Sequence, residues 1–219
     1  MALLLYGSPE QATRASANLR EMHRRIRGTD LDGTKYSALE PSAYAWVHAT
    51  LAEAIIRGHH VFGRAFTLKQ KDDFWQEWVR LGSMMGIRDG DLPDTWRAFE
   101  IYRTDMIDNV LEYNDVIESV QNTAAHAKGG SPFPWLPGRV WGLAGKPLGR
   151  YGAFLARGTM GATLRDKFHI PWTAQQQRSF SRIAAAYRAS NPVIVGPLRQ
   201  AGPLALKVRH REIAKGPFA

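Results

Sequence analysis

Apolar side chains recur every three or four residues along most of this 219-residue chain, the spacing of one face of an α-helix. Helix-start signals such as Ser8-Pro9-Glu10-Gln11, and stop signals such as glycine, bound these stretches. The pattern predicts helices over residues 9–27, 41–57, 68–85, 93–120, 151–168 and 171–190. No strand alternation, heptad run or internal repeat is visible. We therefore predict an all-α fold, a single globular domain with long helices around one core.

Five of the six predicted helices carry an apolar stripe that we expect to face the core. The stripes are Ala15, Leu19, Met22 and Ile26; Tyr44, Val47, Leu51 and Ile55; Phe74, Trp78, Leu81 and Met85; Phe99, Met106, Val110 and Tyr113; and Phe180, Ile183 and Tyr187. Residues 128–150 are rich in glycine and proline, so we expect a loop there, broken at most by a short helix. The domain is predicted to cover residues 1–205. The apolar start MALLLYG leaves open the possibility that an N-terminal helix is truncated. Residues 206–219 form a basic tail.

Composition excludes several function classes. There is no cysteine, which excludes disulfides, thiolate metal sites and a cysteine nucleophile. The net charge of +9 suits an anionic ligand or surface, yet no nucleic-acid-binding signature is present, and we expect no nucleic-acid partner. No stretch is long and apolar enough to span a bilayer, and no signal peptide is visible, so we expect a cytoplasmic protein. The basic surface leaves peripheral contact with a membrane open.

His23 lies between an apolar stripe and a basic helix face. Arg20 and Arg27 stand one turn before and after it in the predicted helix, and Arg24 is adjacent. An imidazole in an apolar hollow, with guanidinium groups at its mouth, suits an iron porphyrin, which is apolar and carries two carboxylates. The alternative is a border histidine with a backbone partner on a surface helix.

His48 lies in the second predicted helix, in the run WVHATL. The small neighbours Ala49 and Ala52 would let a second helix or a flat ligand approach closely. The sequence leaves two interpretations open: a second histidine in a ligand pocket, or a buried histidine bonded to a carbonyl group.

Other sites find little support. His59-His60 follows a glycine and fits a solvated turn, and the Glu-x-x-His pairs of di-iron bundles are absent. The phosphate-binding glycine loop, the dinucleotide fingerprint and the G-x-S-x-G elbow of hydrolases are also absent. A hydrolase with an unrecognised triad stays a third alternative.

Three motifs resemble a known family. They are the run from Arg20 to Gly28, the segment from Gly33 to Pro41, and Trp46 to Leu51. Leu164-Arg165 followed by Ile170-Pro171-Trp172-Thr173 adds to them. Together they resemble the heme-dependent oxygenases that include the fungal mycophenolic-acid-pathway oxygenase and the bacterial latex-clearing (rubber) oxygenases.

The resemblance implies an all-α protein holding one heme b, with dioxygen and an apolar small molecule as substrates. Met22-His23 matches the helical Met-His pair of the rubber oxygenases, which implies His23 as the proximal iron ligand. Arg20, Arg24 and Arg27 become candidates for pairing with the heme propionates. His48 carries over as a pocket position, and we take it as the candidate catalytic residue.

One departure limits the resemblance. Rubber-cleaving members place Arg, Lys and Thr on a distal helix well before the ligand histidine, whereas only 22 residues and no lysine precede His23 here. Polyisoprene cleavage is therefore not supported, and the substrate and oligomeric state stay open. The alternative from another class is a non-enzymatic basic helical protein that binds an anionic lipid or an acidic partner.

Overall fold

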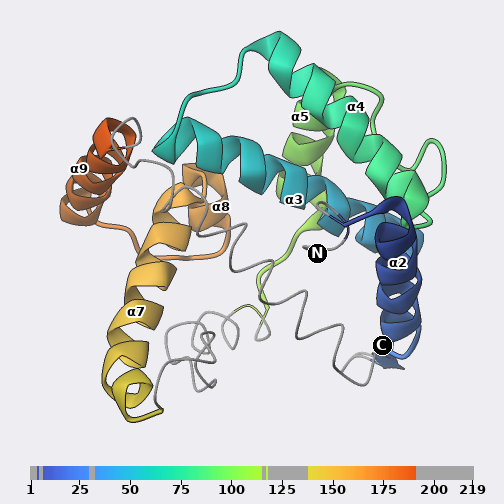
Figure 1. The fold of residues 1–219 in the computed structure, drawn as a ribbon, viewed down its shortest axis with the longest axis horizontal. Helices are drawn as coiled ribbons and strands as arrows, with labels where there is room; N and C mark the ends of the chain where they lie inside the picture. The colour runs from blue at the N-terminus through green and yellow to red at the C-terminus, as the bar shows by residue number, and fades with distance from the viewer. Residues whose placement is uncertain (1–3, 5–6, 30–32, 115–116, 118–137, 191–219) are drawn as a thin grey trace. The chain divides into compact units, whose positions relative to one another are not determined.

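The protein is predominantly helical, as predicted. The computed structural model describes Leu4, residues 7–29, 33–114, 117 and 138–190, with only the backbone described at 138–144. Its elements are α2 (Pro9–Arg24), β1 (Arg27–Thr29), β2 (Lys35–Ser37), α3 (Pro41–Phe62), α4 (Leu68–Met84), α5 (Trp96–Asp105), η1 (Met106–Val110), α7 (Gly138–Thr159), α8 (Ala162–Lys167) and α9 (Ala174–Ser190) (Figure 1). The all-α prediction is confirmed.

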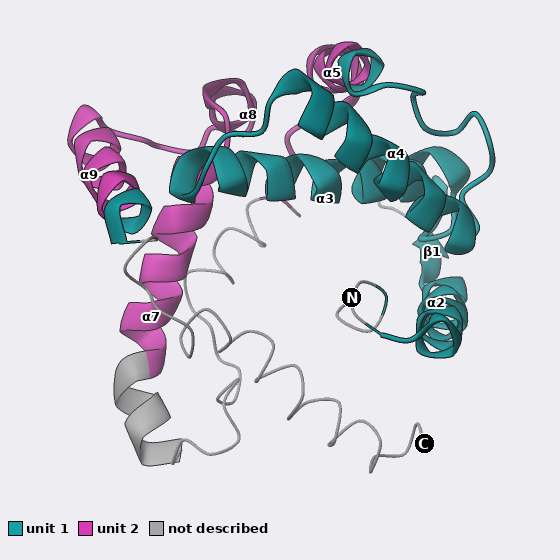
Figure 2. Ribbon diagram, turned by 45° about the horizontal axis from the view of Figure 1, so that its top comes forward, with its two compact units in different colours: residues 1–99, 187–219 teal, residues 100–186 magenta. Residues whose placement is uncertain are grey.

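The chain divides into two compact units, coloured separately in Figure 2. The first comprises residues 1–99 and 187–219, and holds α2, α3 and α4; the second comprises residues 100–186, and holds α7 and α8. The predicted boundary between a domain ending at 205 and a basic tail lies outside the described residues. It stays a prediction.

Helix starts follow the predicted chemistry. At α2 the Ser8 side chain accepts from the Gln11 N–H while the Gln11 side chain accepts from the Ser8 N–H, which completes a capping box. Thr67 and Gln70 repeat this arrangement at α4. At α3 the Glu40 side chain accepts from the Ala43 N–H. These bonds satisfy amide groups that a helix leaves without partners at its N-terminus.

The core of the first unit forms where α3 packs against α4. The buried face of α3 consists of Ala45, His48, Ala49, Ala52 and Ile56. From α4 come Trp75 and Trp78, and the Trp75 ring stacks on Phe99 at 4.7 Å between centroids. Small residues on one helix and large rings on the other allow the two backbones to approach closely.

Several predicted core positions are exposed. Val47 is 56% exposed and Met22 is 52% exposed, while Ile26, Val110, Tyr113 and Tyr187 are also exposed. On α3 the buried stripe is offset from the predicted one, because alanines rather than the largest apolar side chains face α4.

A short two-stranded sheet replaces the predicted helix end and loop after residue 24. Strand β1 pairs antiparallel with β2, and Gly28 stands opposite Tyr36. A Cβ at Gly28 would lie 2.7 Å from the Tyr36 hydroxyl oxygen, so the tyrosine ring covers the bare glycine. The strands are three residues each, too short for a visible alternation.

Three other helix boundaries differ from the predictions. Helix α3 continues to Phe62, five residues beyond the predicted end at 57. The predicted helix over 93–120 begins at Trp96 and turns into the π-helix η1 before Leu111 becomes extended. Residues 115–116 and 118–137 lie outside the described part.

In the second unit, α7 occupies part of the predicted loop at 128–150 and continues to Thr159, despite Pro147 in its interior. The predicted helix over 151–168 is therefore the end of α7 followed by α8. The rings of Phe154, Trp172 and Phe180 pack together in this unit, with centroids 5.2–6.2 Å apart.

The buried Arg165 of α8 ties these elements together. It donates to the carbonyl oxygens of Arg157 and Met160, which lie at the end of α7. Its guanidinium carbon also lies 5.2 Å from the centre of the Trp172 ring. A fixed cation thus satisfies helix-terminal carbonyls and covers an aromatic face.

Candidate functional site

His23 lies in the last turn of α2 with its ring held in one orientation. Its Nδ1–H donates to the Leu19 carbonyl oxygen at 2.8 Å. Because a carbonyl oxygen only accepts, Nδ1 carries a proton, and in the neutral imidazole Nε2 then keeps its lone pair. No hydrogen bond to Nε2 is made by the residues that the structure describes. The half-buried ring meets the Tyr44 ring edge-on at 5.6 Å between centroids. Such a backbone bond fixes the tautomer that metal-ligating histidines use.

Arg20 and Arg24, both on α2, lie in different surroundings. Arg20 Nη1 donates to the Gly86 carbonyl oxygen at 3.3 Å, and Arg20 forms no ion pair with a described residue. Arg24 pairs with Glu21 at 2.7 Å on the surface. Arg20 therefore carries a positive charge with no carboxylate partner in the described part, while Arg24 already has one.

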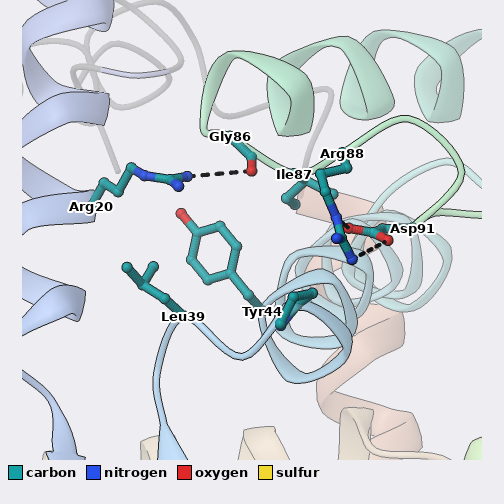
Figure 3. Close-up of a pocket in the computed structure, with 8 residues that line it drawn as sticks. Arg20, Leu39, Tyr44, Gly86, Ile87, Arg88 and Asp91 are labelled. Atoms are coloured by element: carbon teal, nitrogen blue, oxygen red, sulfur yellow. Dashed lines mark hydrogen bonds and ion pairs between the residues drawn. The ribbon is translucent and has the colours of Figure 1, made fainter.

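A cavity of about 130 Å³ opens beside Arg20 (Figure 3). The residues lining it are Arg20 from α2, Leu39 before α3, Pro41 and Tyr44 on α3, and Gly86, Ile87, Arg88 and Asp91 from the loop after α4. Three separate parts of the first unit therefore contribute to this cavity.

Tyr44 places a hydroxyl group in this cavity. Its O–H donates to the Met85 carbonyl oxygen at 3.4 Å, a long hydrogen bond. Burial raises the pKa of the Tyr44 phenol, although the charge of Arg20 opposes this. The phenol is therefore protonated at neutral pH and acts as a donor.

Arg88 and Asp91 compensate each other on the far side of the cavity. Two hydrogen bonds of 3.0 and 3.2 Å join the guanidinium to the carboxylate. The bond to Arg88 holds the pKa of the Asp91 carboxyl below its usual value. Among the described lining groups, this leaves the charge of Arg20 uncompensated.

Arg27 lies on β1 and not one helical turn beyond His23. The predicted spacing is wrong because α2 ends at Arg24. Arg27 and Lys35 line a second, more open hollow of about 460 Å³ along the hairpin. The structure thus brings Tyr44 to His23, but it places the predicted arginines in three different settings.

His48 is buried between α3 and α4, with 3% of its surface exposed. Its Nε2–H donates to the Trp78 carbonyl oxygen at 2.9 Å, and the two rings stack. Burial lowers the pKa of His48, so the ring is neutral. A Cβ at Gly82 would lie 3.0 Å from His48 Nε2, which shows how closely α4 approaches. This is the carbonyl-bonded arrangement that the sequence left open.

Of the residues that line the Arg20 cavity, Arg20 alone was predicted as a site residue. Tyr44 belongs to the stripe that we assigned to the core, and Gly86 was predicted only as a helix stop. Gly86 does end the helix, with φ +87°, and its carbonyl group faces Arg20. The position of Tyr44 one turn before His48 was the signal that could have indicated a site residue, because the hydroxyl of a half-buried tyrosine needs a polar partner.

Comparison with known proteins decides the family. Residues 1–189 match the family described as ER-bound oxygenase mpaB/B′/rubber oxygenase, catalytic domain. The chain belongs to this oxygenase family. The predicted resemblance is confirmed over most of the chain, including the motifs that contain His23, His48 and Trp172.

Curated relatives of this oxygenase-family chain include the uncharacterized protein Mb2261 of Mycobacterium bovis and the uncharacterized protein Rv2237 of Mycobacterium tuberculosis. Each is 24% identical over 172 residues, which is 78% of this chain and 63% of the relative. The chain thus spans less than two thirds of the length of these relatives. No solved structure matches it.

Two further properties of this oxygenase-family chain concern its described residues alone. None of their helices is both long and apolar enough to cross a membrane. Nor do any three of their His, Asp or Glu side chains gather into a group that would hold a metal ion.

Proposed function

We propose that this chain binds one heme b through Nε2 of His23 and acts as a heme-dependent oxygenase on an apolar small molecule. The observation that carries the proposal is the Nδ1–H bond from His23 to the Leu19 carbonyl oxygen, 2.8 Å long. It leaves Nε2 as a lone-pair donor and orients the ring without using any other side chain. Membership in an oxygenase family supports the reaction class.

A heme suits the donor set better than a bare iron ion. A non-heme iron needs about three protein ligands, as in the two-histidine, one-carboxylate sites. A porphyrin supplies its own four nitrogens, so one histidine is enough. When bound, the heme supplies the redox chemistry with dioxygen, while the chain provides the ligand, the orientation of its ring and the cations for the propionates.

Arg20 is the first arginine that we assign to a propionate, because it has no carboxylate partner among the described residues. Arg24 would have to exchange its bond with Glu21, and Arg27 would act from the hairpin. The cavity of about 130 Å³ beside Arg20 has room for a carboxylate group but not for a macrocycle. Residues of the described part therefore account for the ligand and the charge, not for a complete enclosure of the porphyrin.

The catalytic role of His48 remains a proposal. Its Nε2–H is already bonded to Trp78, and the ring is nearly inaccessible. A direct role would require α3 and α4 to separate, so we favour a structural role in which His48 holds α3 against α4.

The test is reconstitution with hemin, followed by visible absorption spectroscopy. The wild type should bind hemin with a Soret band that shifts from that of free hemin, and His23→Gln should lose this band. His48→Gln and the exposed-site control His59→Gln should retain it.

Two results would contradict the proposal. Loss of the band in His48→Gln but not in His23→Gln would mean that the ligand is wrong. A folded wild-type chain that binds no hemin would remove the heme and favour the alternative, a basic helical protein that binds an anionic lipid or an acidic partner.

A further inference from the structure

The cavity beside Arg20 combines two donors that are not fully used. The Arg20 bond to the Gly86 carbonyl is 3.3 Å long, and the Tyr44 bond to the Met85 carbonyl is 3.4 Å long. Both lengths exceed the usual range for these groups. Each donor therefore gains more from a charged acceptor than it loses by leaving its carbonyl.

The two donors come from different helices and converge. Figure 3 shows the Tyr44 hydroxyl pointing toward the Arg20 guanidinium, and a dashed line joins the end of this guanidinium to the Gly86 carbonyl oxygen. Gly86 is at φ +87°, and a Cβ there would lie 1.9 Å from Arg20 Nη1. A glycine at this position thus permits the close approach of the guanidinium to the backbone, which fixes where the cation lies.

The charge balance favours an anion. Arg88 is compensated by Asp91 through two hydrogen bonds, whereas Arg20 has no carboxylate partner among the residues that the structure describes. A planar guanidinium binds a carboxylate with two parallel bonds, and a phenol adds a third donor.

The volume defines which part of a ligand enters. About 130 Å³ is well below the roughly 300–1,000 Å³ of a pocket for a whole small molecule. An end group such as a carboxylate fits, and the remainder of its molecule must lie outside the cavity. The Tyr44 ring also meets the His23 ring edge-on at 5.6 Å between centroids, so the Tyr44 side chain links the cavity to His23.

We propose that Arg20 and Tyr44 form a carboxylate-binding subsite, in which the guanidinium and the phenol hydroxyl donate to the same ligand carboxylate. The ligand is either a heme propionate or a carboxylate on the substrate. The first source rests on the proposed function; the second does not.

The experiment compares ligands with and without the carboxylate. Hemin and its dimethyl ester are titrated by absorbance, and benzoate and benzamide by the shifts of arginine Nε–H signals in NMR. The variants are Arg20→Gln, Arg20→Lys and Tyr44→Phe, the last of which keeps the ring against His23. Arg80→Gln is the matched control, because Arg80 pairs with Glu77 on the exposed face of α4.

A propionate in the subsite predicts that wild type binds hemin about tenfold or more tightly than the diester. Arg20→Gln and Tyr44→Phe should reduce this ratio, Arg20→Lys should be intermediate, and Arg80→Gln should leave it unchanged. A substrate carboxylate predicts instead an unchanged ratio near one, with benzoate but not benzamide shifting the Arg20 signal.

The benzoate titration also separates this inference from the heme proposal. If the folded chain binds no hemin but benzoate still binds in an Arg20- and Tyr44-dependent way, the subsite stands and the heme proposal fails. If neither the hemin-to-diester ratio nor the benzoate shift depends on Arg20 and Tyr44, the subsite is overturned, even where hemin binds. Thermal unfolding of each variant confirms that it is folded.

Discussion

The Trp78 indole N–H donates to the carbonyl oxygen of His48 at 2.8 Å, and the His48 Nε2–H donates to the carbonyl oxygen of Trp78 at 2.9 Å. The two rings stack with centroids 5.1 Å apart. His48 Nδ1 is buried and has no hydrogen-bond partner among the described residues. This reciprocal pair joins α3 to α4, and it suits the neutral imidazole, because a proton on Nδ1 would meet no acceptor there.

Acid should therefore destabilise the fold through His48. Burial lowers the pKa of His48 below its ordinary value of 6.5, so the unfolded chain binds this proton more readily. The free energy of unfolding is fully kept above pH 6.5 and decreases as the pH falls toward the lower pKa of the folded state. Urea titrations at several pH values should show this decrease in the wild type. His48→Gln should flatten it, and the exposed-site change His59→Gln should leave it as in the wild type. An equal slope in His48→Gln would show that another group titrates.

Gly86 and Gly90 offer a matched test of the contact with Arg20. Both have φ +87°, but a Cβ at Gly90 meets no atom within 4 Å, whereas one at Gly86 meets Arg20. Gly90→Ala should lower the free energy of unfolding by about 1 kcal/mol, from backbone strain alone. Gly86→Ala should lower it further, by chemical denaturation, because the guanidinium has to move. In Arg20→Ala this excess should vanish; its persistence would assign it to some other neighbour.

Gly158 and Gly152, both in α7, form a second matched pair. A Cβ at Gly158 would lie 2.3 Å from the Phe180 ring, and one at Gly152 would lie in open space. Gly158→Ala should lower the free energy of unfolding by about 1–3 kcal/mol through overpacking. Gly152→Ala should raise it by about 0.5–1 kcal/mol, because alanine favours the helix. Thermal and urea unfolding measure both, and equal effects would exclude the ring contact.

Asp72 and Asp73 are neighbours on α4, but their side chains make different contacts. Asp72 Oδ1 accepts from the Trp96 N–H at 3.1 Å and so caps α5, while Asp73 pairs with Lys69 at the surface. Asp72→Ala should lower the free energy of unfolding by about 0.5–2 kcal/mol, as loss of a helix cap does. Asp73→Ala should change it by less than about 0.5 kcal/mol. Asp72→Asn, which keeps an acceptor, should recover most of the loss; no recovery would count against capping.

Local chemistry made the helix starts predictable. Ser8 with Gln11, and Pro41 at the first position of α3, form signals that depend on a few neighbouring residues. Gly86 likewise marks the end of α4, because a left-handed residue is needed there. The family was also accessible, since its motifs are short runs around His23 and His48.

Packing between segments was much less predictable. Val47 is larger and more apolar than Ala49, yet Val47 is exposed and Ala49 is fully buried, because α4 approaches α3 closely. Composition predicted a loop where α7 contains Pro147, and three-residue strands left no pattern. The cavity brings together Arg20, Tyr44 and Gly86, which span 66 residues of sequence, and no local sequence pattern predicts that they lie close together.

Arg165 holds the second unit by donating to two carbonyl oxygens and by covering the face of the Trp172 ring. His48 holds the first unit through a neutral ring, and burial lowers the pKa of this ring. A fall in pH below 6.5 therefore loosens the contact between α3 and α4 through His48. Amide hydrogen exchange should show that the protection of α3 and α4 decreases as the pH falls below 6.5.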